Sequence, residues 1–441
     1  MRNQDCMERR AGLPIVLVVL LACTSPTPRS VPDPGGSKDR TSSQVRLGNV
    51  STREAIKRLC HYPPFEDEPA PSSGFTPSAV AEVERQVQQL RGLALLRPVP
   101  VDAVTPAELL RGIRQLAVRS LPADMYKRRS LAWQTIGAVP EGTDLVDVFT
   151  KDPGAGVIGY YVPQIGELRF IGTENPSPDE RVTLAHELTH AIDDQHFDLT
   201  RADEAFGACR DDTGLAFQSL FEGNATYFMG VWALRYLSPI EQFGVSLKAI
   251  AEPHGTVRGV PNFLRDGLFP YFAGLKFVQT LVRRDGVGAI DEAFRNPPVS
   301  TEQIIHPKKY PRDVPRRVDI ADFGPALGNA WKDLDVLEIG EEWLRSLIGL
   351  RLTSASAEIA AEGWDGGLYR AWSHGEEAAV VLSTVWDSHA EASEFAVRMS
   401  GWIEGDQFAE VRPVEGDRVT VIFASAGEPL SRLQAAVETV P

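Results

Sequence analysis

Apolar residues recur at helical spacing in long stretches of this chain, and the pattern predicts a mostly helical architecture. The repeat is clear near residue 80, where one face carries Val80, Val83, Val87 and Leu90. Residues three and four positions apart share a helix face, so such a face is expected to pack inward. The same pattern predicts helices over residues 76–95, 122–136, 178–196, 212–236, 262–287, 289–294 and 336–361, and a further one starting near Thr105.

Alternating apolar and polar residues predict fewer strands. Residues 156–162 and 167–171 flank a Pro163–Gly166 turn, which is typical of an antiparallel hairpin, and a short strand is expected within 97–104. Beyond Gly363 the pattern changes to strands over 368–372, 378–385, 409–413 and 418–425 and helices over 388–402 and 429–440. The predicted class is α+β: a mostly helical domain with a small antiparallel sheet over residues 76–362, then a small α+β domain over 363–441.

The amino end has the features of a targeting segment. Basic residues precede an apolar run from Leu13 to Ala22, which is short for a bilayer-spanning helix. Leu20–Cys23 resembles a bacterial lipobox, so we expect a lipoprotein signal peptide over residues 1–22 and a lipid on Cys23. An ordinary cleaved signal peptide and an uncleaved anchor are the alternatives. Residues 23–75, rich in Pro, Ser and charge, are expected to be a flexible tether. The expected location is outside the cytoplasm, lipid-anchored to the bacterial cell envelope.

Charge and cysteine content narrow the partners. The 441 residues carry 45 Lys and Arg against 60 Asp and Glu, a net charge of −15. This balance argues against nucleic acid, or an anionic membrane surface, as the main partner.

Four cysteines are present. Cys6 would leave with the signal peptide and Cys23 would carry the lipid. Cys60 and Cys209 could form a disulfide in an oxidising compartment or remain separate thiols, and their spacing leaves both possibilities open.

The most specific chemical signal is His186-Glu187-Leu188-Thr189-His190. On a helix, residues four apart lie on one face, so His186 and His190 could bind one metal ion together. Glu187 points about 100° away from His186 and could reach a metal-bound water rather than the metal. Ser177-Pro178-Asp179-Glu180 reads as a capping box that starts this helix.

A zinc site of this kind needs a third protein ligand. Glu222 is the preferred candidate, because it lies among apolar residues of the next predicted helix, where an unpaired carboxylate would be costly to bury. A glutamate at a solvated helix edge is the simpler alternative. Asp193, Asp194 and His196 are competing ligands, but they follow His190 on the same helix and point partly off the histidine face.

The pattern HExxH followed by a glutamate on a later helix resembles the gluzincin zinc metallopeptidases. More closely, Gly159-Tyr160-Tyr161, the HExxH stretch through Asp198, the Glu222–Thr226 segment and Ser300–Tyr310 are similar to a group of largely uncharacterised bacterial and archaeal gluzincin-like proteins. The resemblance covers roughly residues 76–360 and implies a zincin-like catalytic domain. Thermolysin-like gluzincins have an aspartate four residues after the glutamate ligand to orient the first histidine, whereas this chain has Thr226 there.

The resemblance implies a zinc metallopeptidase, and the lipobox-like segment adds a membrane anchor. His186, His190 and Glu222 would bind Zn²⁺, Glu187 would be the general base, and the substrate would be a peptide or protein. Strand-like residues 157–161 could pair with an extended substrate or serve only the fold. His306 or Tyr310 could stabilise the oxyanion, with His254 and Tyr227 as weaker candidates. Two other classes remain: a catalytically inactive, metal-stabilised envelope lipoprotein, and a zinc amidase acting on a cell-wall bond.

Overall fold

The structure is a computed structural model that describes residues 47–61, 78–151, 158–172, 175–251, 262–264 and 268–439. The expected signal peptide, Cys23 and His254 lie outside these residues.

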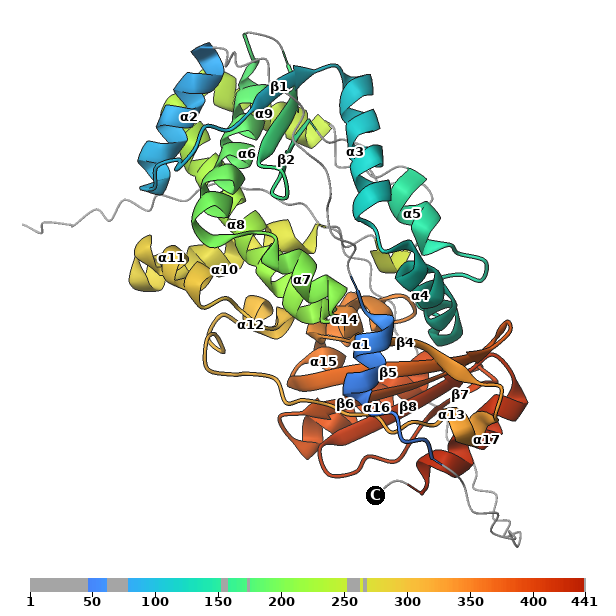
Figure 1. The fold of residues 1–441 in the computed structure, drawn as a ribbon. Coiled ribbons are helices and arrows are strands. Elements are labelled where there is room, and N and C mark those ends of the chain that lie inside the picture. Colours follow the sequence, from blue (N-terminus) through green and yellow to red (C-terminus); the bar gives the residue numbers. More distant parts are fainter. Residues whose placement is uncertain are drawn as a thin grey trace, which may run out of the picture. The chain divides into compact units, whose positions relative to one another are not determined.

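The fold belongs to the α+β class, as predicted (Figure 1). The helices are α1 (Thr52–Leu59), α2 (Ser78–Arg91), α3 (Pro106–Ser120), α4 (Ala123–Ile136), α5 (Leu145–Lys151), α6 (Pro178–Phe197), α7 (Arg201–Gly207), α8 (Asp211–Tyr236), α9 (Pro239–Ala251), α10 (Phe269–Asp285), α11 (Gly288–Arg295), α12 (Thr301–Ile305), α13 (Gly324–Leu327), α14 (Glu341–Gly349), α15 (Ser354–Ala361), α16 (His389–Trp402) and α17 (Gly427–Val437), with a 3₁₀ turn at Asn262–Leu264.

A three-stranded sheet lies beside helix α6. Its order is β1 (Val101–Val104), β3 (Glu167–Ile171), β2 (Gly159–Val162), so β2 is an edge strand. Strands β2 and β3 form the predicted antiparallel hairpin, but β1 runs parallel to β3 and the sheet is therefore mixed. Apolar residues of this sheet, including Leu168 and Phe170, share a buried cluster with Leu184 and Leu188 of α6. The sheet and the helix are thus held together by one core.

The carboxyl-terminal part is built on a five-stranded antiparallel sheet of order β4-β5-β6-β8-β7. Its strands are β4 (Lys332–Glu338), β5 (Trp364–His374), β6 (Glu377–Trp386), β7 (Ala409–Val411) and β8 (Arg418–Ala424). The boundary expected at residue 363 falls inside this sheet, because β4 pairs with β5. The single helix predicted over 336–361 is wrong, since β4 occupies its start and α14 and α15 the remainder. Strand β4 is buried from Leu334 to Leu337, and a strand buried on both faces lacks the alternation that identifies strands in a sequence.

Part of the segment expected as a flexible tether is structured. Ser51 caps helix α1, and the Thr52 hydroxyl accepts a hydrogen bond from the Ile320 N–H at 3.0 Å and donates to the Ile320 carbonyl at 3.1 Å. The buried Arg370 of β5 donates to the carbonyl of Val50 at 2.9 Å. Composition alone missed this segment, because its few apolar residues, Leu47, Ala55, Ile56 and Leu59, pack on partners that are distant in the sequence.

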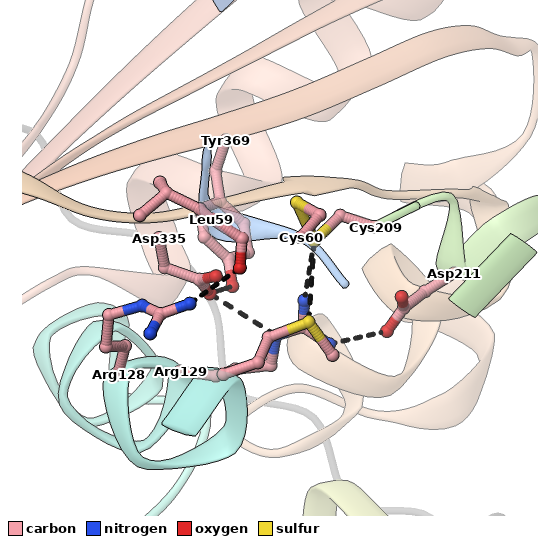
Figure 2. The surroundings of a disulfide bond; sticks show 9 residues. Leu59, Cys60, Arg128, Arg129, Cys209, Asp211, Asp335 and Tyr369 are labelled. Atoms are coloured by element: carbon pink, nitrogen blue, oxygen red, sulfur yellow. Dashed lines mark hydrogen bonds and ion pairs between the residues drawn. A yellow bond between two sulfur atoms is a disulfide. The ribbon is translucent and has the colours of Figure 1, made fainter. Parts of the chain in front are cut away.

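Cys60, just after α1, forms a disulfide with Cys209, just before α8. Figure 2 shows Arg129 of α4 beside this bond. Its guanidinium donates to Asp211 at 3.0 Å and to Asp335 at 3.3 Å, and it lies 3.6 Å from the Cys209 sulfur. The buried Arg129 therefore joins α4, the start of α8 and strand β4 around the disulfide.

In the part of the chain described here, no helix has the length and hydropathy needed to cross a membrane.

Replacing Cys60 with Ser is expected to lower the free energy of unfolding by about 2–5 kcal/mol, because the disulfide closes a long loop in the unfolded chain. The two cysteines are separated by 149 positions in sequence. Urea denaturation of the oxidised wild type, the variant and the reduced wild type measures this effect. Equal stability of wild type and variant under oxidising conditions would contradict the assigned bond.

Candidate metal centre

Helix α6 begins at Pro178, as the capping box predicts. The Ser177 hydroxyl accepts from the Glu180 N–H at 3.4 Å, and the Glu180 carboxylate accepts from the Ser177 N–H at 2.7 Å. The helix is buried from Leu184 to Asp194, which includes the whole HExxH stretch. His186, Glu187 and His190 are therefore held in a helix that packs on several sides.

Helix α8 packs against α6 and brings Glu222 to the two histidines. Glu222 Oε2 lies 3.1 Å from His186 Nε2 and 3.3 Å from His190 Nε2. The two Nε2 atoms are 3.0 Å apart. Three potential ligand atoms from two helices thus form a nearly equilateral triangle, which we call the His186–His190–Glu222 triangle. The residues that the sequence selects as metal ligands are those that the structure brings together.

The triangle fits a metal ion of the size and chemistry of zinc. Bonds of ~2.0–2.2 Å in tetrahedral geometry imply ligand atoms roughly 3.3–3.6 Å apart, slightly more than the spacing seen here. The donor set also fits, since two imidazole nitrogens and one carboxylate oxygen are common zinc ligands. Both nitrogens face each other and the same carboxylate oxygen. A cation satisfies all three lone pairs at once, whereas protons satisfy them only if an imidazole becomes charged.

Glu222 and Glu187 differ in the direction in which their surroundings shift the pKa. Burial acts to raise the pKa of Glu222, but His190 and His186 outweigh it and hold this pKa well below its usual range. Burial raises the pKa of Glu187 to about 7 in the metal-free protein. The nearby Glu222 adds to this rise, while His186 and the N–H of Tyr161 oppose it. Glu222 is therefore a permanent anion suited to a ligand, and Glu187 is a carboxylate suited to proton transfer near neutral pH.

A third helix adds Tyr271, which the sequence analysis missed. The Tyr271 ring stacks on His186, with ring centres 6.1 Å apart and an angle of 25°. Burial and the negative charges of Glu222 and Glu187 raise the pKa of Tyr271, so its hydroxyl stays protonated beside the Glu222 carboxylate. Tyr271 lies in helix α10, where the sequence pattern predicted a helix but no functional residue.

Two glycines allow α10 to lie this close. A β-carbon at Gly223 would be 2.1 Å from the carbonyl carbon of Gly274, and one at Gly274 would be 1.9 Å from the carbonyl oxygen of Ser219. The backbones of α8 and α10 are therefore in direct contact where they cross. Gly223 follows Glu222, and Gly274 is one turn from Tyr271, so the crossing places ligand and tyrosine together. A glycine in each of two apolar helices was the sequence signal for this crossing.

The competing ligands on α6 have other partners. Asp193 accepts from Arg91 at 2.8 Å and from Asn224 at 2.5 Å. Asp194 accepts from the Tyr161 hydroxyl at 2.8 Å, and His196 lies 2.8 Å from the carbonyl of Ala94. These contacts agree with the preference for Glu222.

Three residues expected to stabilise an oxyanion make other contacts. His306 Nε2 is 3.1 Å from a Glu341 carboxylate oxygen, and this hydrogen bond raises the pKa of His306. Tyr310 donates to the carbonyl of Asn296 at 2.6 Å, and Tyr227 packs edge-on against Phe228. His306 is not part of the ligand cluster found among the described residues. In the Ser300–Tyr310 segment, Ser300 caps the start of α12 and His306 follows its end. His306 then pairs with Glu341 of α14.

A second group of acidic residues is already paired with a lysine. Glu302, Asp313 and Asp387 also place carboxylate oxygens within 4.8 Å of one another. The Lys309 ammonium lies between them, at 2.6, 3.1 and 2.7 Å respectively. This cluster is therefore an ion-pair network between α12, the following loop and the end of β6.

Comparisons with known proteins say little about this centre. The sequence model of a family described as "Domain of unknown function (DUF8575)" matches residues 339–434, which contain neither α6, α8 nor α10. No curated protein matches the chain. A crystal structure from Chloroflexus aurantiacus, described as a candidate hydrolase with a novel fold, is similar over 58% of this chain and 95% of its own, with a TM-score of 0.35 and 19% identity.

Substituting Gly223 with Ala is expected to destabilise the fold by about 1–3 kcal/mol and to weaken metal binding, because the new methyl group overlaps the α10 backbone. Gly230 lies on the same helix with nothing within 4 Å of its β-carbon position. Gly230→Ala should instead be neutral or stabilise by up to ~1 kcal/mol through helix propensity. Thermal denaturation and zinc titration of the pair measure the contrast, and equal behaviour would contradict the close crossing.

Proposed function

We infer that this chain is a zinc-dependent metallopeptidase that hydrolyses peptide bonds. The observation that supports this most directly is the His186–His190–Glu222 triangle with Glu187 beside it. The resemblance to gluzincins points to the same assignment, since their HExxH…E pattern maps onto these four residues.

When bound, zinc supplies a Lewis acid and a water whose pKa is lowered toward ~7. Glu187 accepts a proton from the attacking water and then donates it to the leaving amine. Burial raises the pKa of Glu187 to about 7 in the metal-free protein, and the charge of bound zinc would favour the ionised form that accepts this proton. The Tyr271 hydroxyl, which stays protonated and is hydrogen-bonded to Glu222 in the structure, would turn to the oxygen of the scissile carbonyl and donate to it as negative charge develops there. This role replaces the one expected for His306.

The proposed location is the bacterial cell envelope, with the chain exported and anchored by a lipid on Cys23. The Cys60–Cys209 disulfide supports export, because disulfides persist mainly in oxidising compartments. The lipobox-like Leu20–Cys23 sequence supports the anchor. Labelling cells with a radiolabelled or alkyne fatty acid tests it, with Cys23→Ser as the variant that should lose the label.

Glu187→Gln is expected to keep zinc near wild-type content and to lower kcat/KM by ~10²–10⁴, because the general base is lost while the ligands remain. Glu222→Ala is expected to lose zinc and activity together. Elemental analysis beside a casein and peptide-library assay measures these effects. Glu292→Gln, an exposed carboxylate on α11, is the control and should match wild type.

The outcomes separate the three classes of function. An active Glu187→Gln variant would refute the assigned base. A zinc-loaded wild type that cleaves no peptide but opens peptidoglycan fragments would be the cell-wall amidase. A zinc-loaded protein inert toward both substrates would be the metal-stabilised lipoprotein.

Tyr271→Phe is expected to lower kcat by ~10²–10³ with KM and zinc content little changed, because the hydroxyl acts mainly on the developing charge. The control is Tyr126→Phe, a half-buried tyrosine on α4 that packs on Phe149. Steady-state kinetics on a fluorogenic peptide measures both variants. If Tyr271→Phe raised KM and left kcat intact, the tyrosine would be a binding residue instead.

A further inference from the structure

The edge strand β2 is connected to the general base by a backbone hydrogen bond. Tyr161 is opposite Leu168 in the hairpin, and the Leu168 N–H donates to Pro100 on the other side of β3. The Tyr161–Leu168 pair is therefore a non-hydrogen-bonded pair, in which the Tyr161 N–H points to the open edge. There it donates to Glu187 Oε2 at 2.8 Å.

The side chain of the same residue is tied to the same helix. The Tyr161 hydroxyl donates to Asp194 Oδ2 at 2.8 Å. Glu187 and Asp194 are seven residues apart, which is two turns along one face of α6. Tyr161 thus contacts α6 at two points, through its backbone at one and its hydroxyl at the other.

The three residues that form these two contacts are buried. Tyr161, Glu187 and Asp194 are each 8% exposed. Burial and the neighbouring Asp194 charge raise the pKa of Tyr161, so its hydroxyl remains a donor. Asp194 also accepts from the Leu199 N–H at 3.1 Å, which holds the carboxylate in place. In a site largely closed to water, few alternative partners compete with these bonds.

We propose that Tyr161 is a positioning residue for Glu187: its hydroxyl bond to Asp194 sets the edge of β2 against α6, so that its N–H holds one oxygen of the base and leaves the other for the attacking water. This inference rests on the proposed peptidase function for its catalytic consequence. The geometric part stands without it. A carboxylate fixed at one oxygen reaches its reactive orientation with less loss of rotational freedom than a free one.

The geometric part is tested by hydrogen exchange at the Tyr161 amide, resolved by NMR in the full chain. In the wild type this edge amide should exchange at least about tenfold more slowly than the Gly159 amide, which also points to the open edge. Glu187→Ala and Tyr161→Phe should each remove that protection.

A matched control is Tyr369→Phe in strand β5. Tyr369 is fully buried and its hydroxyl also donates to a buried aspartate, Asp335. This variant loses the same kind of bond far along the chain from α6. Its global stability is expected to fall, yet the protection ratio of Tyr161 to Gly159 should stay at the wild-type value.

The catalytic part is tested on zinc-loaded protein. Tyr161→Phe should lower kcat about tenfold with KM and zinc content near wild type, whereas Tyr369→Phe should keep kcat per folded molecule. The double variant Asp194→Ala/Tyr161→Phe should have a kcat no lower than that of the more damaging single variant, because both substitutions break the same hydrogen bond.

Each result supports or overturns the inference. Fast exchange at the wild-type Tyr161 amide, or protection that survives Glu187→Ala, would overturn it whatever the activity. A protected amide with an unchanged kcat in Tyr161→Phe would overturn the positioning role and leave the peptidase assignment standing. A wild type that cleaves no peptide would remove the proposed function, and amide exchange alone would then decide the Tyr161 link.

Discussion

The burial of the Glu222 carboxylate against two imidazoles is the interaction on which this site depends. A charged carboxylate in a protein interior is costly unless opposite charge or hydrogen bonds compensate it. Here its neighbours lower its pKa despite its burial. The compensation requires that α6 and α8 keep the relative position that brings this carboxylate within 3.1 and 3.3 Å of the two imidazoles. The packing around α6 and α8 maintains that position.

Four features fix the positions of the two helices. The capping box sets where α6 begins, and the sheet β1-β3-β2 packs on it through a shared apolar core. The backbone contact between Gly223 and Gly274 sets how closely α10 approaches α8. At its start α8 is fixed from outside the site, because the Asp212 carboxylate accepts from the N–H and hydroxyl of Thr301, at 3.1 and 2.5 Å, and the Thr301 hydroxyl accepts from the Glu342 N–H at 3.1 Å. Helices α12 and α14 thus contribute to the metal site by fixing the start of α8.

Local signals predicted well the features that depend on neighbouring residues. Ser177 with Glu180, and the spacing of His186 and His190, identify α6 and its face because capping and helical period act within a few residues. Glu222 could be selected because an acid among apolar residues needs a partner. Tyr271 and strand β4 could not be found this way. Tyr271 acquires its place only from the crossing of two helices, and β4 from pairing with β5, and both are long-range contacts that leave no local period.

The disulfide has a mechanical consequence. Cys60 follows helix α1 directly, and the carbonyl of its partner Cys209 accepts a hydrogen bond of 2.9 Å from the Glu338 N–H at the end of β4. A pull on the amino end of the chain would first load helix α1, and the force would then cross a covalent bond to the root of α8. Under tension, noncovalent contacts can break one after another, whereas the force on the disulfide is borne by a single covalent bond. The segment beyond Cys60 would be shielded from the strain.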